Sequence, residues 1–439
     1  MKYTLLIFTL LYCSIWSISQ EKLSLKQAIN KALENNYQIK LVKTNQESAR
    51  LQNNWYSAGF SPTFSLNVGD NANIADNSNN PFTFFPGNVF SNNLKLSVDM
   101  NWTIFNGFGI RISKTKLEQL EEQTNGNAIV VIENTIYDVI IAYYTAIVQK
   151  RKLNVVENLL NFSKQKLSYF KLKSNLGTNS SFDLLEFENQ VLSDSTNLLV
   201  QKLALKNAKR NLNLLMAESI ESDYILTDKL EFTTTNLKYE KLLQMMKMSN
   251  QNLKNQYINL ELQDLEIKAK KTAYYPVVTL NLGYSPSSSY IKLLGNQNQD
   301  VNTSAINYYG GINANYILFN GWNKKRAVEI SKIQYKTAEL QVKELELKLA
   351  HQLKGIIELY NTQIQIEEMS FKMVKHAEKL WELGKEKYNL GLINVFNLND
   401  IKTSYQRSVL SYFDQLFNAL KSHYDLLRIT GQISQEYTS

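Results

Sequence analysis

The chain carries one pattern twice, with a constant offset of 214 residues between the two copies. The recurring landmarks are Pro62 and Pro276, Phe105-Asn106-Gly107 and Phe319-Asn320-Gly321, Leu176-Gly177 and Leu390-Gly391, and Asn36 and Asn250. Because no insertion separates these landmarks, each copy is expected to be one structural unit. We predict a first repeat at residues 20–217, a linker at 218–237, a second repeat at 238–431 and a tail at 432–439.

The first 19 residues have the features of a secretory signal peptide. Lys2 provides a basic start, an apolar stretch runs from Leu5 to Trp16, and Ser17-Ile18-Ser19 fits a cleavage site. The single cysteine, Cys13, lies in this segment, so the mature chain is expected to have no disulfide and no thiolate metal site. Lipidation of Cys13 is the alternative, although Tyr12 precedes it where a lipoprotein signal has a small residue.

Composition and motifs argue against several functional classes. The net charge is +8, but the basic residues alternate with acidic ones at helical spacing, which is typical of solvated helix faces and not of a nucleic-acid surface. No uninterrupted run of about 18 apolar residues follows the N-terminus, so no transmembrane helix is expected. His351, His376 and His423 are isolated, and no metalloprotease, nucleophile-elbow or phosphate-loop motif occurs. We therefore predict no enzymatic activity, no cofactor and no metal site.

Each repeat contains a pair of amphipathic strands, within residues 62–105 and 276–319. In residues 94–105 the side chains alternate: Leu94, Leu96, Val98, Met100, Trp102 and Ile104 share one face, and Lys95, Ser97, Asp99, Asn101 and Thr103 share the other. Residues 308–319 repeat the pattern, and the partner strands follow Pro62 and Pro276. The intervening residues 69–93 and 285–307, rich in Asn, Ser and Gly, are predicted to be long external loops.

Strands of about 9–11 residues with one apolar face suit the wall of an outer-membrane barrel. The polar face, with Asp99, Asn101, Asn313 and Asn315, would then line the lumen. A half-buried sheet in a soluble domain is the alternative. Four strands cannot close a barrel, and an open edge in lipid leaves backbone groups unpaired, so a membrane location requires several chains to contribute strands.

The remaining sequence predicts helices. Helical patterns at 24–58 and 238–273 lead toward the strands. Phe108 to Asn175 and Trp322 to Asn389 contain no proline, and their apolar residues recur in steps of three and four, as in coiled coils. Each would extend for about 100 Å. Helices at 181–217 and 395–431 then return antiparallel after glycine turns, which gives a mainly α fold with membrane β-structure.

The motifs taken together resemble the TolC-like family of outer-membrane efflux factors. They are Ala32-Leu33-Glu34-Asn35-Asn36, the two Phe-Asn-Gly turns, Phe182-Asp183-Leu184-Leu185-Glu186 and Phe396-Asn397-Leu398-Asn399-Asp400. The chain departs from the family at Tyr37, where proline is usual, and at Asn106 and Asn320, where aspartate is frequent. The resemblance covers nearly all of the mature sequence.

The resemblance implies a homotrimer in the outer membrane of a Gram-negative bacterium, with a twelve-stranded barrel and a periplasmic coiled-coil tunnel. It further implies a passive exit duct for a tripartite efflux or type I secretion system, supplied by an inner-membrane pump. The hairpin tips, Leu176, Gly177, Leu390 and Gly391, would dock a periplasmic adaptor protein. Asp400, Asn397, Asp183 and Glu186 would ring the pore constriction and attract cations, although Asp183 also fits a helix N-terminus.

Two other protein classes are alternatives. A trimeric coiled-coil surface or adhesin-type protein anchored by a barrel would usually have its strands at one end of the chain. A periplasmic adaptor would lack amphipathic membrane strands. Here the strands lie in the middle of both repeats, which favours the duct.

Overall fold

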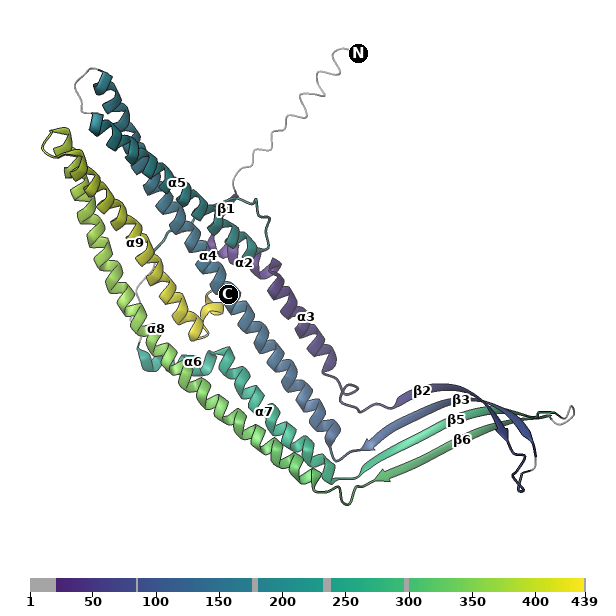
Figure 1. Ribbon diagram of the computed structural model, residues 1–439. Coiled ribbons are helices and arrows are strands. Elements are labelled where there is room, and N and C mark those ends of the chain that lie inside the picture. Colours follow the sequence, from purple (N-terminus) through teal and green to yellow (C-terminus); the bar gives the residue numbers. More distant parts are fainter. Residues whose placement is uncertain (1–20, 84–85, 176–180, 232–237, 296–299, 438–439) are drawn as a thin grey trace, which may run out of the picture. The chain divides into compact units, whose positions relative to one another are not determined.

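The computed structural model describes residues 21–83, 86–175, 181–231, 238–295 and 300–437 (Figure 1). The predicted signal peptide and the turn residues Leu176 and Gly177 lie outside these ranges. The chain divides into two compact units. Unit 1 comprises Met1–Lys43, Asn127–Asn252 and Leu345–Ser439, and unit 2 comprises Thr44–Gly126 and Leu253–Glu344.

The helices and strands follow the order that the duplication predicts. Unit 1 contains β1 (Glu21–Leu23), α2 (Leu25–Asn35), α5 (Ser181–Met216), β4 (Tyr224–Leu226), α6 (Tyr239–Ser249), α9 (Val395–Ile429) and α10 (Ile433–Tyr437). Unit 2 contains β2 (Thr63–Asp76), β3 (Asn88–Phe105), a 3-10 turn at Thr272–Tyr274, β5 (Val277–Leu293) and β6 (Asp300–Asn315). Four helices have residues in both units: α3 (Tyr37–Gln52), α4 (Gly109–Asn175), α7 (Gln251–Lys271) and α8 (Asn323–Asn389).

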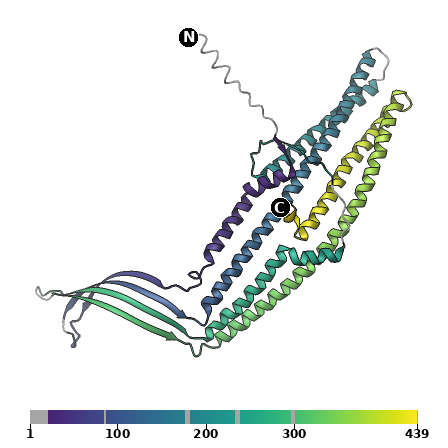
Figure 2. The same cartoon turned by 180° about the vertical axis from the view of Figure 1, so that it is seen from behind.

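The two long helices are confirmed, since α4 and α8 have 67 residues each. In unit 1, α5 lies beside α4 and α9 lies beside α8, as Figures 1 and 2 show from opposite sides. The predicted helices 24–58 and 238–273 are each interrupted, at Asn36 and Asn250. The Asn36 side-chain amide donates to the Leu215 carbonyl at 2.8 Å, and that of Asn250 donates to the Ile429 carbonyl at 2.9 Å.

These two contacts are related by the same offset of 214 residues. In both, the asparagine side chain donates a hydrogen bond to a backbone carbonyl in the last turn of a returning helix. Carbonyls in that turn have no backbone N–H of their own helix to accept from. The repeat is therefore reproduced at the level of single hydrogen bonds.

Unit 1 has a continuous apolar core around the middle of α4. Val139, Ile140 and Tyr143 are completely buried there, in a cluster that β1, α2, α5 and α9 also supply. The Tyr143 hydroxyl lies 2.5 Å from the Asp228 carboxylate, and burial together with this carboxylate raises the pKa of Tyr143. Within the described residues, Gly109–Leu172 contains one 18-residue window apolar enough to span a membrane. This window contains polar residues, so it is not an uninterrupted apolar run, and more than half of it is buried in the protein.

Unit 2 contains one antiparallel sheet with strand order β2-β3-β5-β6 (Figure 2). The register aligns apolar side chains across all four strands in rows such as Leu66, Val98, Tyr284 and Tyr308. Each of these four side chains is exposed. On the opposite face, Asp99 accepts hydrogen bonds from Asn67 and Ser97 at 2.8 and 2.7 Å. The predicted two-faced strands are confirmed.

The prediction that residues 69–93 and 285–307 form external loops is wrong. The strands have 14 to 18 residues and continue through most of both segments. An antiparallel ladder is held by backbone hydrogen bonds, so polar Asn and Ser residues can extend it once the register is set. At its C-terminal end, β6 is shorter than predicted. It ends at Asn315 and not at Phe319, so Tyr316 and Leu318 lie outside the strand.

Gly283 allows one side chain to cross the polar face of the sheet. It lies between Asp99 and Tyr309 in one row of the register, and the Tyr309 hydroxyl donates to Asp99. A Cβ at Gly283 would overlap the Tyr309 ring. The glycine is therefore required by close packing and not by its backbone angles.

We expect Gly283→Ala to lower the thermal midpoint of the folded protein, because the added methyl displaces the Tyr309 ring. In a Tyr309→Ala background the same substitution should have little effect. Circular dichroism melts of the two single variants and the double variant measure this coupling. Additive losses would show that the ring does not occupy the space above Gly283.

Candidate functional site

The candidate site lies in unit 1, where the two helical hairpins come together near their tips. The rings of Phe182 on α5 and Phe396 on α9 have centroids 5.6 Å apart. Deeper in, Leu159, Trp381 and Leu398 form a buried apolar cluster. Hairpin α4–α5 is therefore packed against hairpin α8–α9 by aromatic and aliphatic side chains.

The second hairpin turn has the predicted left-handed cap. Gly391 has a φ of 74°, and its amide donates to the Tyr388 carbonyl at 3.0 Å. Leu390 and Leu392 are strongly exposed, at 74% and 68%. The equivalent residues Leu176 and Gly177 lie outside the described residues.

The four residues predicted for the constriction divide into two kinds. Asn397 and Asp400 are exposed on the first turns of α9. The N-cap residue of α9, Asn394, accepts a hydrogen bond from the Asn397 amide at 2.9 Å. Because they are three residues apart, Asn397 and Asp400 share one face of the helix.

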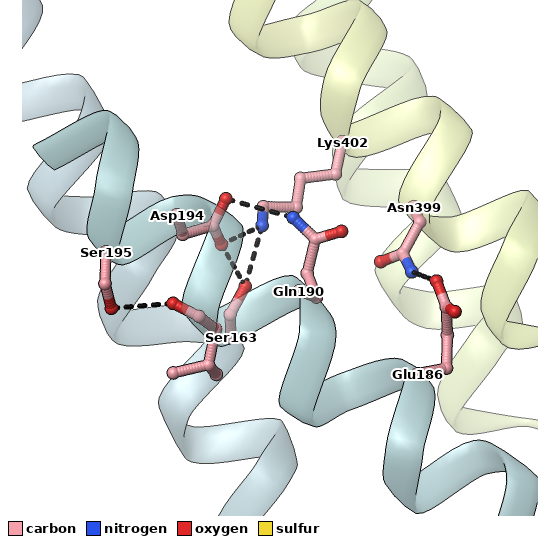
Figure 3. A network of polar contacts seen from close by, with 8 residues as sticks. Ser163, Glu186, Gln190, Asp194, Ser195, Asn399 and Lys402 are labelled. Atoms are coloured by element: carbon pink, nitrogen blue, oxygen red, sulfur yellow. Dashed lines mark hydrogen bonds and ion pairs between the residues drawn. The ribbon is translucent and has the colours of Figure 1, made fainter. Parts of the chain in front are cut away.

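The other two, on α5, are half-buried and face the second hairpin. Glu186 accepts a hydrogen bond from Asn399 at 3.2 Å (Figure 3). Asp183 acts on Tyr388, whose pKa is raised to about 12, mainly by burial and further by this carboxylate. The structure thus connects Asp183 and Glu186 to the second hairpin and leaves Asn397 and Asp400 open.

Below the tips, a buried ionic network joins the two hairpins (Figure 3). Lys402 of α9 is 1% exposed, and its ammonium group contacts Asp194 of α5 and the Ser163 hydroxyl of α4, the latter at 2.7 Å. Ser163 donates to Asp194 at 2.7 Å, and Gln190 donates to the other carboxylate oxygen at 3.0 Å. Three helices from two hairpins therefore share one charge pair.

Removal from water and ion pairing have opposite effects on the pKa of Lys402. Burial lowers the pKa of Lys402, while Asp194 acts to raise it. Charges withdrawn from water are tolerated in a fold only when they are paired and hydrogen-bonded, as both are here. The network therefore fixes which face of α9 meets α4 and α5.

Sequence reasoning missed this network, although a signal was present. Val395, Leu398, Lys402 and Val409 are all buried and follow helical spacing along α9. A lysine in such an apolar stripe indicates a buried partner, and Asp194 stands seven residues after the buried Phe187 in the same way.

The residues predicted for the lumen face lie together in unit 2. Asp99 and Asn101 occupy alternate positions of β3, and Asn313 and Asn315 alternate in the same way on β6. The register links Thr103 to Thr279 and Thr279 to Asn313, which places these side chains on one face of the sheet. Among the described residues, no group of three or more His, Cys, Asp or Glu side chains is placed to hold a metal ion.

Comparisons with a protein family and with solved structures agree with the fold described above. Residues 28–218 match the family described as outer membrane efflux protein. The chain therefore resembles the TolC-like outer-membrane efflux proteins. This confirms the resemblance predicted from the motifs. The match lies in the first repeat, and the comparison with curated protein sequences gives no match.

Solved structures show the same fold over almost the whole chain. A membrane protein from Pseudomonas aeruginosa is 13% identical, with a TM-score of 0.75 over 93% of this chain and 92% of that one. The outer membrane channel CmeC of Campylobacter jejuni is 14% identical, with a TM-score of 0.73 over 94% and 88%. The open-state outer membrane channel MtrE of Neisseria gonorrhoeae is 15% identical, with a TM-score of 0.71 over 93% and 88%.

We expect Lys402→Met to destabilise the protein by about 3–5 kcal/mol, because it leaves Asp194 buried without its counter-charge. The double variant Lys402→Met/Asp194→Leu should recover most of this loss. Denaturant unfolding measures both. Lys372→Met, which removes an exposed ion pair with Glu368, is the matched control and should change little. Equal effects of Lys402→Met and Lys372→Met would mean that the network does not stabilise the hairpins.

Proposed function

We propose that this protein is an outer-membrane exit duct of a tripartite efflux or type I secretion system. The observation that carries the proposal is the sheet of unit 2, whose four strands present apolar rows to the exterior and polar side chains on the other face. An exposed apolar face of this extent is costly in water and matches the lipid-facing wall of a membrane barrel. The family match and the channel folds support the same function.

The sheet is proposed to become part of a twelve-stranded barrel in a homotrimer. Strands β2 and β6 are the edges of the sheet, and each has one paired neighbour in the chain. In lipid, unpaired backbone groups are not satisfied by water, so these edges require strands from other subunits. Asp99, Asn101, Asn313 and Asn315 would line the lumen.

The helical part is proposed to form a tunnel in the periplasm of a Gram-negative bacterium. Its hairpin tips would dock a periplasmic adaptor protein that links the duct to an inner-membrane pump. The exposed Leu390 and the Gly391 turn present an accessible surface at the second tip. In this proposal the pump supplies the energy, and the chain conducts substrates passively without catalysing a reaction.

The alternative of a surface or adhesin-type protein is less well supported. Each strand pair lies between helices of its own repeat, so the chain leaves and re-enters the helical region twice. A tunnel built of hairpins needs this arrangement, whereas a projecting stalk does not.

The constriction is proposed to lie at the tips. Asp400 and Asn397, which are exposed, are the best placed to face a pore axis, and Asp183 and Glu186 support α9 from the side. A ring of carboxylates from several subunits would attract cations and repel anions.

We expect Val98→Lys to block assembly in the membrane, because a lysine on the lipid-facing side costs roughly 2–4 kcal/mol per chain. Asn101→Lys, three residues along β3 and on the polar face, is the control and should assemble normally. The measurement is the yield of heat-modifiable oligomer in outer-membrane fractions. Equal assembly of both variants would contradict a barrel wall.

For the constriction, Asp400→Ala should reduce cation selectivity and weaken block by divalent cations in planar-bilayer recordings, because the ring loses its negative charge. Asp414→Ala, farther along α9, serves as the control and should leave both properties unchanged. Unaltered currents in Asp400→Ala channels would remove this residue from the constriction.

A further inference from the structure

Two glycines lie inside the long helix α8, and packing explains one of them. A Cβ at Gly384 would lie 3.0 Å from the Ile401 side chain of α9, so the helices approach too closely there for a larger residue. At Gly355, apart from the adjoining residues of α8, no described atom lies within 4 Å of such a Cβ. Glycine inside a helix costs about 1 kcal/mol relative to alanine, and close packing does not account for this cost at Gly355.

The first repeat has a bulky side chain at the equivalent position. The offset of 214 residues relates Gly355 to Ile141 of α4, which packs against the apolar core of unit 1. The same offset relates Arg428 of α9 to Leu214 of α5. The second repeat therefore lacks one apolar side chain of the first and has a charged residue in place of another.

A cavity of about 470 Å³ opens at Gly355. It lies within unit 1, where α9 ends and α7 begins, and α4 and α8 also contribute to its lining. Asn250, which binds the Ile429 carbonyl at the end of α9, lines the cavity together with Ile429. Ligand pockets of proteins typically measure about 300–1,000 Å³, so this cavity has room for a small organic molecule.

The lining combines amide and apolar side chains. Three exposed amide residues, Asn134, Asn252 and Gln352, come from α4, α7 and α8. A side-chain amide both donates and accepts hydrogen bonds, so it can pair with an amide or a hydroxyl group of a ligand. The apolar members are Leu349, Ile356, Leu359 and Ile429. This lining suits a molecule that has both polar groups and an apolar side chain.

Two lining residues are charged, and their charges compensate. Asp425 and Arg428 form an ion pair at 3.4 Å, and the Arg428 guanidinium lies 4.2 Å from the centroid of the Tyr137 ring. Burial and a hydrogen bond to Asp425 raise the pKa of Tyr137. A charged ligand would have to displace one member of this pair and would lose its own hydration. The cavity therefore favours a neutral ligand.

We infer that this cavity binds a neutral organic molecule that carries amide groups and an apolar side chain, such as a short peptide blocked at both ends. The side chain missing at Gly355 makes room for the ligand, and the amides of Asn134, Asn252 and Gln352 bind its polar groups. The inference goes beyond the proposed duct, because it concerns a site within unit 1 of one chain and holds whether or not the chain conducts substrates.

Binding of one neutral probe and two charged analogues tests the ligand class. N-acetyl-leucyl-leucinamide is neutral, whereas at about pH 6 N-acetyl-leucyl-leucine is an anion and leucyl-leucinamide is a cation. Equilibrium dialysis against the full mature chain in lipid nanodiscs, with empty nanodiscs as the blank, should show about tenfold tighter binding of the neutral probe. Equal binding of all three would overturn the neutral-ligand assignment, and no binding of the neutral probe would overturn the site.

Gly355→Leu tests the location. The leucine side chain should fill the cavity and weaken binding of the neutral probe about tenfold or more. Leucine favours a helix more than glycine does and its Cβ meets open space, so the thermal midpoint should be unchanged or higher, which separates lost binding from lost folding. The matched control is Thr362→Leu, two turns along α8 at an exposed position outside the lining. Equal binding by these two variants would place the probe elsewhere and overturn the inference.

Single substitutions test the amides. Asn134→Leu, Asn252→Leu and Gln352→Met roughly keep the side-chain size and remove the hydrogen-bonding groups. Each should weaken binding of the neutral probe about two- to tenfold, the value of one hydrogen bond. Unchanged affinity in all three variants would show that these amides do not recognise the ligand.

Discussion

The backbone hydrogen bonding of one open sheet is the constraint on which the rest of this structure depends. Among the described residues, strands β2 and β6 each present an edge without a partner strand, and the sheet also exposes apolar rows such as Leu66 and Val98. Water can satisfy an edge but disfavours the apolar face, whereas lipid favours the face but cannot satisfy the edge. The closed assembly of several copies in a membrane that we propose would satisfy both requirements.

The helical hairpins solve a different problem, because they must stay together along a narrow contact. Aromatic pairs such as Phe182 with Phe396 hold the tips, and a buried ion pair between Lys402 and Asp194 lies behind them. Apolar packing is largely non-directional, so it tolerates rotation of one helix about its axis. A buried charge with a single partner does not, since any rotation that separates the pair leaves both charges desolvated. The network therefore gives the hairpin contact a defined register.

Much of this fold follows from sequence periodicity, and the failures have physical causes. Alternation in residues 94–105 predicted β3, and the spacing of apolar residues predicted α4 and α8, because burial on one face imposes those periods. The residues 69–93 were misread as a loop, since Asn and Ser do not favour strands in isolation but continue a ladder already in register. The break at Asn36 and the role of Lys402 depend on partners about 180 and 210 residues away, Leu215 and Asp194, which local patterns do not contain.

The duplication allows the contacts of one repeat to be compared with those of the other. Contacts within a repeat occur twice, as with Asn36 to Leu215 and Asn250 to Ile429. Contacts from the first repeat to the second occur once in the chain, as with Phe108 on Tyr275. The equivalent turn residue of the second repeat, Trp322, is exposed, and a groove lined by Phe60 lies just before β2. In the shared barrel that we propose, another copy would supply the reverse contact, from a second repeat to a first, and such head-to-tail contacts close into a ring when the rotation between copies closes.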